Sequence, residues 1–425
     1  MKNTKKVLLA CLFAVCALGM VFAGGSKASD KTVLNVMGYG DNATAEGQSF
    51  IRIIEAFEEE NPDVDVTYEL LFDQAYHQKA TARLASGDVP DVAYMGLGTD
   101  GVWGVYWSEA GQQIAMDPYL DTSIYSLSAF GSANADGSHS FVPLGIANMC
   151  SVVFVNTELL SSLGLSMPTT YADMKAMVSV ANANGIDVLG IGGGASWVWV
   201  SPILSNFIAQ TSGAADAPEQ LGAGAMAYNG PEMMATLNFL KTMVDDGVLS
   251  TDAAIIDVGT AITKFNNGEY LFYMGGQWDA GSVSVALQET MDMVAFPAIP
   301  GAKGYETSVA AAVSPGYGLT KSGEAKGLSE VAMRFINYYN SKAEVEQRLR
   351  DGGISGSVLA NHNLPSDLPR IAELKGALAA EAVVTQVLDA YVVGDPISIL
   401  STGAQEIILG TKTPQQIADA MEAAR

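Results

Sequence analysis

Thr32-Val-Leu-Asn-Val-Met37 is predicted to form a strand, because its apolar and polar residues alternate. Apolar residues at helical spacing follow over 48–60, and an extended pattern returns over 64–71. A second helical run over 76–85 then leads to a short apolar strand at 89–95. Strands and helices that alternate with such short connections predict an α/β fold with a mainly parallel sheet flanked by helices.

A second unit of the same kind begins near Pro143. Strands are predicted at 152–155, 188–191 and 270–274, with helices between them and through the last quarter of the chain. About 400 residues are too many for one ordinary core, which also favours two domains. Ligands of such sheets bind beyond the carboxyl ends of the strands. The loops that follow the predicted strands are therefore the segments in which we expect a binding site.

The first 23 residues have the pattern of a signal peptide. Three lysines within the first six residues precede an uncharged apolar run over 7–22, and Val21-Phe22-Ala23 fits a cleavage site before Gly24. This apolar run is short for a membrane span. We therefore expect a protein that is exported to the periplasm or another extracytoplasmic space. Lipid attachment at Cys11 or Cys16 is the alternative, which a short preceding apolar stretch and a bulky preceding valine, respectively, disfavour.

Acidic residues outnumber basic ones by 46 to 22, which gives a formal net charge of −24. Removal of the three signal lysines, with no acid in that segment, makes the balance −27 (46 against 19). Such a charge argues against nucleic acid and anionic membranes as partners, and we expect a soluble monomer. Cys150 would be the one cysteine left after cleavage, so no disulfide within the chain is expected. Its apolar surroundings favour a buried structural thiol.

Six segments, taken in order, carry a resemblance to a known family. They are FEEENPDVDV at 57–66, ASGDVPDV at 85–92, FVNTELL at 154–160, PTTYADM at 168–174, FNNGEY at 265–270 and LGTKTPQQIA at 409–418. Together they resemble the extracellular solute-binding proteins of carbohydrate ABC importers, the maltose-binding-protein-like family 1. The segment 143–149 departs from this pattern, since many relatives carry a Pro-Tyr or Pro-Phe pair there.

The resemblance implies a two-lobed periplasmic-binding-protein fold of type II, with a ligand cleft at the hinge. It implies a signal peptide at 1–23, an N-terminal lobe of 30–142 plus about 280–325, and a C-terminal lobe of 143–279 plus about 326–425. The lobes would close around a sugar and deliver it to the membrane subunits of an ABC importer, without a cofactor.

Aromatic residues in loops after predicted strands are the candidates for stacking on the apolar faces of a sugar, and neighbouring polar residues are candidates for bonding its hydroxyls. Trp278 is the leading candidate, because it follows Gly275-Gly276 and is flanked by Gln277 and Asp279. The other expected ligand-binding residues are Trp197, Trp199, Trp103, Tyr39, Tyr317, Asp100, Asp41 and Glu46. Each also has a structural interpretation: the aromatic residues as packing groups, the acids as helix caps.

Enzymatic interpretations find little support in the sequence. The three histidines, His77, His139 and His362, are scattered, so neither a zinc site nor a Ser-His-Asp triad is expected, and the glycine runs lack phosphate-binding spacing. We therefore expect no catalysis and no metal. Three alternatives stay open: a glycosidase that uses a carboxylate pair, a binding protein for polyamines or another small solute, and a receptor that presents its ligand to a sensor.

Overall fold

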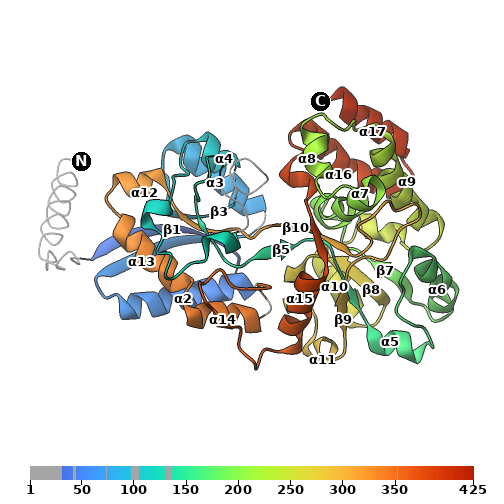
Figure 1. Cartoon of the computed structure of the whole chain (residues 1–425), viewed down its shortest axis with the longest axis horizontal. Helices are drawn as coiled ribbons and strands as arrows, with labels where there is room; N and C mark the ends of the chain where they lie inside the picture. The colour runs from blue at the N-terminus through green and yellow to red at the C-terminus, as the bar shows by residue number, and fades with distance from the viewer. Residues whose placement is uncertain are drawn as a thin grey trace, which may run out of the picture.

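The computed structural model describes residues 31–41, 45–72, 74–96, 105–130, 134, 136–351 and 353–425. Two lobes lie side by side, and the chain passes between them more than once (Figure 1). Among these residues, no helix is both long enough and apolar enough to cross a lipid bilayer. The mixed architecture of sheets flanked by helices agrees with the α/β fold expected from the sequence.

The first lobe is built on a five-stranded sheet in the order β2-β1-β3-β11-β4. The strands β1, β2 and β3 are parallel, and β11 runs antiparallel to its neighbours β3 and β4. Their bounds are β1 Thr32–Tyr39, β2 Val64–Leu71, β3 Val92–Met95, β4 Val142–Pro143 and β11 Gly316–Leu319. One reversed strand in a set of parallel ones makes the sheet mainly parallel, as predicted.

Helices cover both faces of this sheet because each presents an apolar stripe to it. In α2, the residues Phe50, Ile53 and Phe57 are fully buried, and Phe57 packs edge-on against Phe335 of α13 at 5.5 Å between ring centroids. The helices of this lobe are α2 Ala45–Glu60, α3 Gln74–Ser86, α4 Val105–Glu109, α12 Lys321–Ala325, α13 Ser329–Tyr339 and α14 Lys342–Arg350, with the short turns η1 Asp117–Tyr119 and η2 Leu127–Phe130.

The second lobe has a four-stranded sheet in the order β7-β8-β6-β9. The strands β7 and β8 are parallel, and β6 runs antiparallel to β8 and β9. The bounds are β6 Val152–Val155, β7 Asp187–Gly190, β8 Tyr270–Gly275 and β9 Asp292–Val294. All six residues of β8 are buried, as expected of a central strand covered on both faces.

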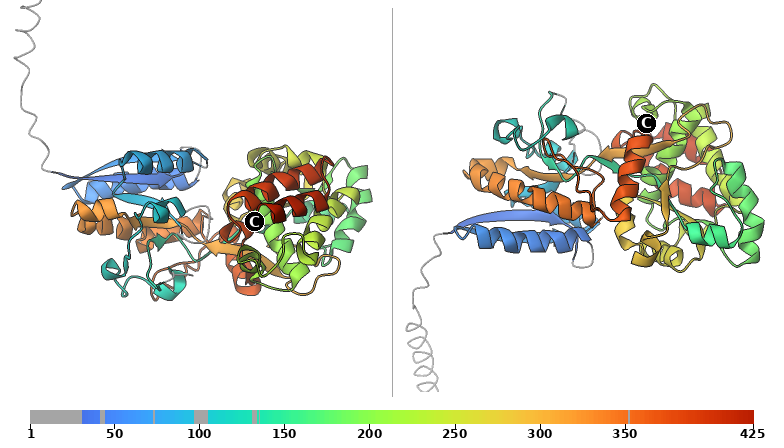
Figure 2. Two further views of the ribbon diagram at one scale, coloured as in Figure 1. Left: turned by 90° about the horizontal axis from the view of Figure 1, so that it is seen from above. Right: turned by 60° about the horizontal axis from the view of Figure 1, so that its bottom comes forward.

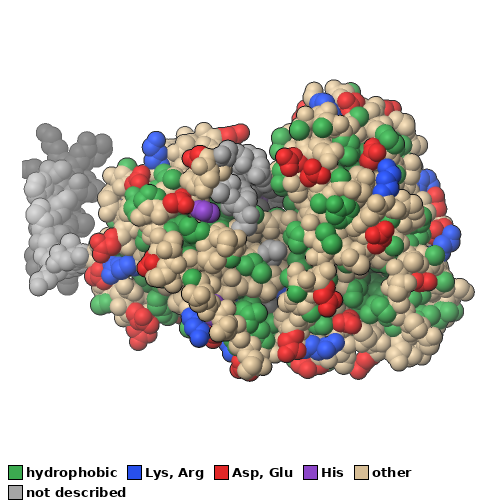
Figure 3. All heavy atoms as spheres, in the orientation of Figure 1, with side chains coloured by type: hydrophobic (Ala, Val, Ile, Leu, Met, Phe, Trp, Pro, Cys, Tyr) green, Lys and Arg blue, Asp and Glu red, His purple; other side chains and the backbone are tan. Residues whose placement is uncertain are grey.

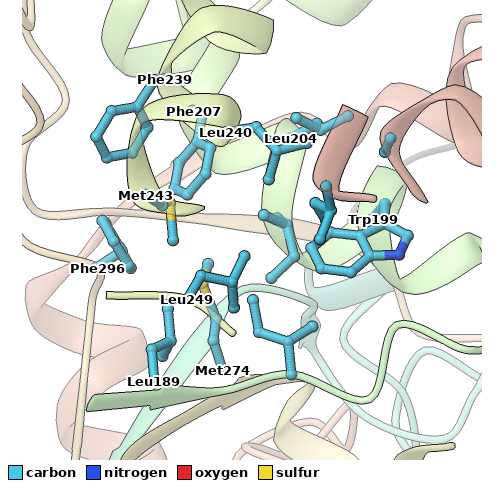
Figure 4. Packing of buried hydrophobic residues seen from close by; sticks show 14 of the residues in the cluster. Leu189, Trp199, Leu204, Phe207, Phe239, Leu240, Met243, Leu249, Met274 and Phe296 are labelled. Atoms are coloured by element: carbon cyan, nitrogen blue, oxygen red, sulfur yellow. The ribbon is translucent and has the colours of Figure 1, made fainter. Parts of the chain in front are cut away.

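The core of this lobe joins the sheet to helices from distant parts of the chain. Phe207, Phe239 and Phe296 pack edge to face in it, and Trp199 lies at one end of the cluster (Figure 4). The helices are α5 Thr157–Ser162, α6 Tyr171–Ala183, α7 Ser205–Ser212, α8 Ala217–Gly222, α9 Pro231–Asp245, α10 Val258–Asn266, α11 Val285–Gln288, α15 Arg370–Glu381, α16 Asp395–Ile408 and α17 Pro414–Ala423. Shorter turns are η3 Trp199–Leu204, η4 Thr251–Ala254, η5 Gln277–Ser282 and η6 Leu388–Ala390.

Three segments join the lobes. Two of them belong to the pairs β4–β5 and β10–β11, and the third runs from α14 to α15. A three-stranded sheet, β12-β10-β5, lies at this connection and consists of β5 Ala147–Met149, β10 Ser308–Val313 and β12 Val383–Thr385. The lobes remain distinct on either side of it in both views of Figure 2.

The division of the chain between the lobes differs from the expected one at two places. The segment after residue 280 stays in the second lobe, because β9 pairs with β6, and the chain returns to the first lobe only between β10 and β11. Conversely, α13 and α14 belong to the first lobe, because Phe335, Ile336 and Val345 are buried in its core. Apolar periodicity predicts both helices but does not say which core receives them.

Candidate ligand-binding cleft

The carboxyl ends of the parallel strands in each lobe face the other lobe. In the first lobe, Gly316 pairs with Met95 at the end of β3, and Gly316 comes directly after a segment that joins the lobes. In the second lobe, Gly275 at the end of β8 pairs with Val152, which follows another joining segment. The surface is hollowed where the lobes meet (Figure 3). Loops at these strand ends therefore border a common cleft.

Trp197 and Trp278 lie together on the second-lobe side of this cleft. Their ring centroids are 6.1 Å apart, with an angle of 45° between the planes, and both side chains are half-buried. The Trp278 indole folds back over the backbone of Gly276, where a Cβ would lie 2.2 Å from the ring. A larger residue at 276 would therefore displace the Trp278 indole from this position. The pair forms an angled aromatic surface at the ends of β7 and β8.

Gln277 and Asp279, which flank Trp278, are buried and bonded within the lobe. The Asp279 carboxylate accepts hydrogen bonds from the Tyr273 hydroxyl at 2.8 Å and from the Gly276 backbone N–H at 3.2 Å. The Gln277 amide donates to Asn148 Oδ1 at 3.1 Å. Asp279 thus caps the turn that carries Trp278, and its surface is 6% exposed. The expectation that Asp279 accepts ligand hydroxyls is corrected by this burial: it positions Trp278 instead.

Trp199 and Tyr317 are also buried, and the packing corrects their expected contact with a ligand. Trp199 is wholly buried and donates from Nε1 to the Gly193 carbonyl at 2.8 Å. The chain is helical from Trp197 onward, so the side chain two residues later turns away from the cleft into the core. Tyr317 is 1% exposed and packs on Tyr339 in the first-lobe core, with ring centroids 4.6 Å apart.

Tyr39 lies on the first-lobe side of the cleft, at the carboxyl end of β1. It stacks on Tyr94 with ring centroids 5.1 Å apart and planes 9° apart, and Phe72 lies 5.2 Å away. Phe72 is 43% exposed, and Asp41 is exposed two residues after Tyr39. A recess of about 30 Å³, room for little more than one water, lies beneath. It is lined by Tyr39, Ser49, Tyr94, Leu144, Tyr317, Tyr339, Arg348, Asp351, Gly353 and Ile354.

Three expected site residues cannot be placed. Asp100 and Trp103 lie outside the described residues, and so does the side chain of Glu46, whose backbone is in α2. Their expected contact with a ligand stays a prediction.

Asp389 is a cleft residue that the sequence did not reveal. It lies in η6, is partly exposed, and accepts a hydrogen bond from the hydroxyl of Ser201. Ser201 is presented by η3, a widened helical turn that contains Pro202 and begins two residues after Trp197. The residue after Asp389, Ala390, packs against the same small apolar cluster as Trp278. Asp389 therefore belongs to the same side of the cleft as the tryptophan pair.

Burial raises the pKa of Asp389 above its ordinary value, while the hydrogen bond from Ser201 acts in the opposite direction. A carboxyl group with a raised pKa beside aromatic rings is typical of a functional site. Cys150, in the same apolar cluster, is a buried free thiol whose pKa is raised by burial and then by the Asp389 charge. No group of acidic, histidine or cysteine residues among the described ones is arranged to hold a metal ion.

Comparisons with known proteins agree with this architecture. Residues 40–346, more than half of the chain, match the family model described as bacterial extracellular solute-binding protein. Comparison with curated proteins gave no match.

Solved structures give the same fold at low sequence identity. A chitin oligosaccharide binding protein superposes with a TM-score of 0.79 at 19% identity, over 93% of this chain and 98% of that one. A protein connected with xylan utilization by the thermophilic bacterium Caldanaerobius polysaccharolyticus gives 0.76 at 18% identity, over 92% and 100%. The maltose-bound MalE3 of T. maritima gives 0.73 at 15%, over 92% and 98%.

Proposed function

The chain belongs to the bacterial extracellular solute-binding proteins, and on that premise we propose that it binds a mono- or oligosaccharide in the interlobe cleft. The lobes close around the ligand, and the closed protein delivers it to the membrane subunits of an ABC importer. The protein works outside the cytoplasm as a monomer after cleavage of residues 1–23. It needs no cofactor and performs no catalysis on its ligand.

The observation that carries the sugar assignment is the angled pair of Trp197 and Trp278 beside the Ser201–Asp389 pair. A sugar has apolar C–H faces and a rim of hydroxyl groups, so it needs aromatic surfaces and polar groups in close combination. The described part of the second lobe supplies both within one strand-end region. Proteins of the same fold that are described as binding maltose and chitin oligosaccharide support this ligand class.

The arrangement of the lobes supports closure. Tyr39 and Phe72 present a second aromatic surface on the first lobe, across the cleft from the tryptophan pair. The joining segments touch each other closely: a Cβ on Gly145 would lie 2.9 Å from Ile354, and the Leu144 backbone N–H donates to the Pro315 carbonyl at 3.1 Å. Rotation about this connection would bring the two aromatic surfaces together on a ligand.

Isothermal titration calorimetry with neutral mono- and oligosaccharides tests the proposal. We expect at least one to bind, and we expect the Trp278→Ala variant to weaken that binding by about tenfold or more, as for an aromatic anchor. Val285→Ala, a change at a side chain 74% exposed on α11, is the control that should leave affinity unchanged. Absence of binding to every sugar, or equal affinity in the folded Trp278→Ala variant, would contradict the proposal.

A second measurement separates binding from catalysis. Incubation of the protein with the sugar that binds should release no reducing sugar. Release that a single carboxylate substitution abolishes would instead favour a glycosidase.

A further inference from the structure

Asp389 is half-buried, and the groups around its carboxylate are unusual. Burial raises the pKa of Asp389, while hydrogen bonds from the Ser201 hydroxyl and from its own backbone lower it. No Lys, Arg or His among the described residues affects this pKa. Most carboxylates held in protein interiors have a cationic partner, because an uncompensated charge in a region of low dielectric constant is costly. In the described part of the chain, Asp389 thus has one neutral side-chain hydrogen-bond donor, Ser201, and no cationic partner.

The described loops that border the cleft also lack cationic residues that could pair with Asp389. The described stretches that follow the relevant strands or carry the aromatic residues contain three acids, Asp41, Asp279 and Asp389, and no Lys, Arg or His; these stretches are 38–41, 190–201, 275–282 and 386–393. One of the acids, Asp279, is used as a cap within its own lobe. These described stretches therefore supply no cationic partner for Asp389.

We infer that Asp389 determines ligand specificity by pairing with a protonated amino group, so that the cleft takes an amino sugar. This inference rests on the proposed sugar-binding function and narrows its ligand class. An ammonium group would supply the missing counter-charge, and at short range in a cleft this attraction is much stronger than in water. The tryptophan pair on the same side of the cleft also favours a cation, since the indole face attracts positive charge. A hydroxyl at the same place would bond Asp389 without compensating its charge, and a carboxylate would be repelled.

The test compares sugars that differ in one substituent. Calorimetry at pH 7 would use mono-, di- and trisaccharides of the glucose and galactose series, each with a hydroxyl, an amino, an N-acetylamino or a uronate group. We expect the amino form of the sugar that binds to bind at least tenfold more tightly than its hydroxyl form, and the uronate form most weakly. The Asp389→Asn variant should reduce the amino preference to about twofold or less while it still binds the hydroxyl form.

Asp187→Asn is the matched control. Burial also raises the pKa of Asp187, but this residue begins β7 at the end of the sheet away from the cleft. The control variant should keep the full preference for the amino form. A preference that disappears equally in both variants would contradict a specific role of Asp389.

The outcomes separate this inference from the proposed function. Binding of hydroxyl and amino forms with equal affinity, tightest binding of the uronate, or an unchanged preference in Asp389→Asn would overturn the inference and leave sugar binding intact. Failure of every sugar in the panel to bind would overturn the proposed function and this inference with it.

Discussion

Trp197 and Trp199 are separated by one residue but face different surroundings, and substitution of each should affect a different property. Trp199 is wholly buried, and replacement of a buried tryptophan by alanine costs about 3–5 kcal/mol of unfolding free energy. The lost hydrogen bond to the Gly193 carbonyl adds only about 1 kcal/mol, because the Gln405 side-chain amide also donates to this oxygen at 2.7 Å. Trp199→Ala should therefore destabilise the protein by about 4–6 kcal/mol.

Trp197→Ala should instead reduce sugar affinity strongly and stability only slightly. Its side chain is half-buried at the cleft surface, so we expect a loss of stability of about 1 kcal/mol. Loss of an aromatic ligand contact worth about 2 kcal/mol would raise the dissociation constant roughly 30-fold. Trp199→Phe, which keeps most of the ring volume in the core, should bind the sugar with wild-type affinity.

Two assays on the same variants separate an effect on stability from an effect on affinity. Urea unfolding followed by circular dichroism gives stability in the absence of sugar, and calorimetry gives affinity under conditions in which each variant is folded. The reasoning would be refuted if Trp199→Phe weakened binding tenfold at unchanged stability. It would equally be refuted if Trp197→Ala left affinity unchanged.

Three further predictions follow from buried groups. Because burial raises the Asp389 pKa above its ordinary value of 3.8, the wild type should lose stability relative to Asp389→Asn as pH rises from 3.8 through the folded-state pKa. Urea unfolding of both proteins between pH 3.5 and 8 checks this, and a pH-independent difference between their unfolding free energies would contradict it. Cys150 is 4% exposed with a raised pKa, so a thiol reagent at pH 8 should modify it only after unfolding; rapid labelling of the native protein would show access that the structure denies. Gly403→Ala should destabilise the protein by about 1–3 kcal/mol, since the added Cβ would lie 2.6 Å from Ile417. Gly376→Ala in α15 adds a Cβ that meets nothing within 4 Å, and should stabilise the protein by about 0.5–1 kcal/mol. Thermal denaturation compares the two variants, and equal shifts in melting temperature would show that α16 and α17 do not pack as described.

The sequence predicts the fold well where local pattern decides it. The expected strand from Thr32 to Met37 corresponds to β1, and the helical spacing over 48–60 corresponds to most of α2. Helix α6 begins where PTTYADM indicates, because Thr170 and Asp173 form a capping box there. These features need only neighbours in the chain, so a sequence displays them directly.

The cleft is less visible from sequence because its residues come together only in the folded chain. The strand-end position of Trp197 and Trp278 marked both as candidates, and the structure places the two rings together. Whether the Trp199 side chain points into the cleft or into the core depends on whether the chain is helical there. The preceding glycine run does not indicate that a helix begins at Trp197. The sequence does not predict Asp389 as a cleft residue, because its partner Ser201 is 188 residues away and no sequence pattern near Asp389 indicates a strand end.

The three joining segments have a consequence for the order in which the protein acquires its structure. The core of the second lobe contains Leu189 and Leu240, but also Leu400, Ile407 and Met421 from α16 and α17. On a ribosome, this lobe cannot complete its core until α17 has emerged, and contacts between residues so far apart in the chain slow folding. The first lobe likewise waits for Phe335 and Val345. A nascent chain of this design therefore stays incompletely folded until α17 has been synthesised, which keeps it accessible to chaperones while all the preceding elements are being made.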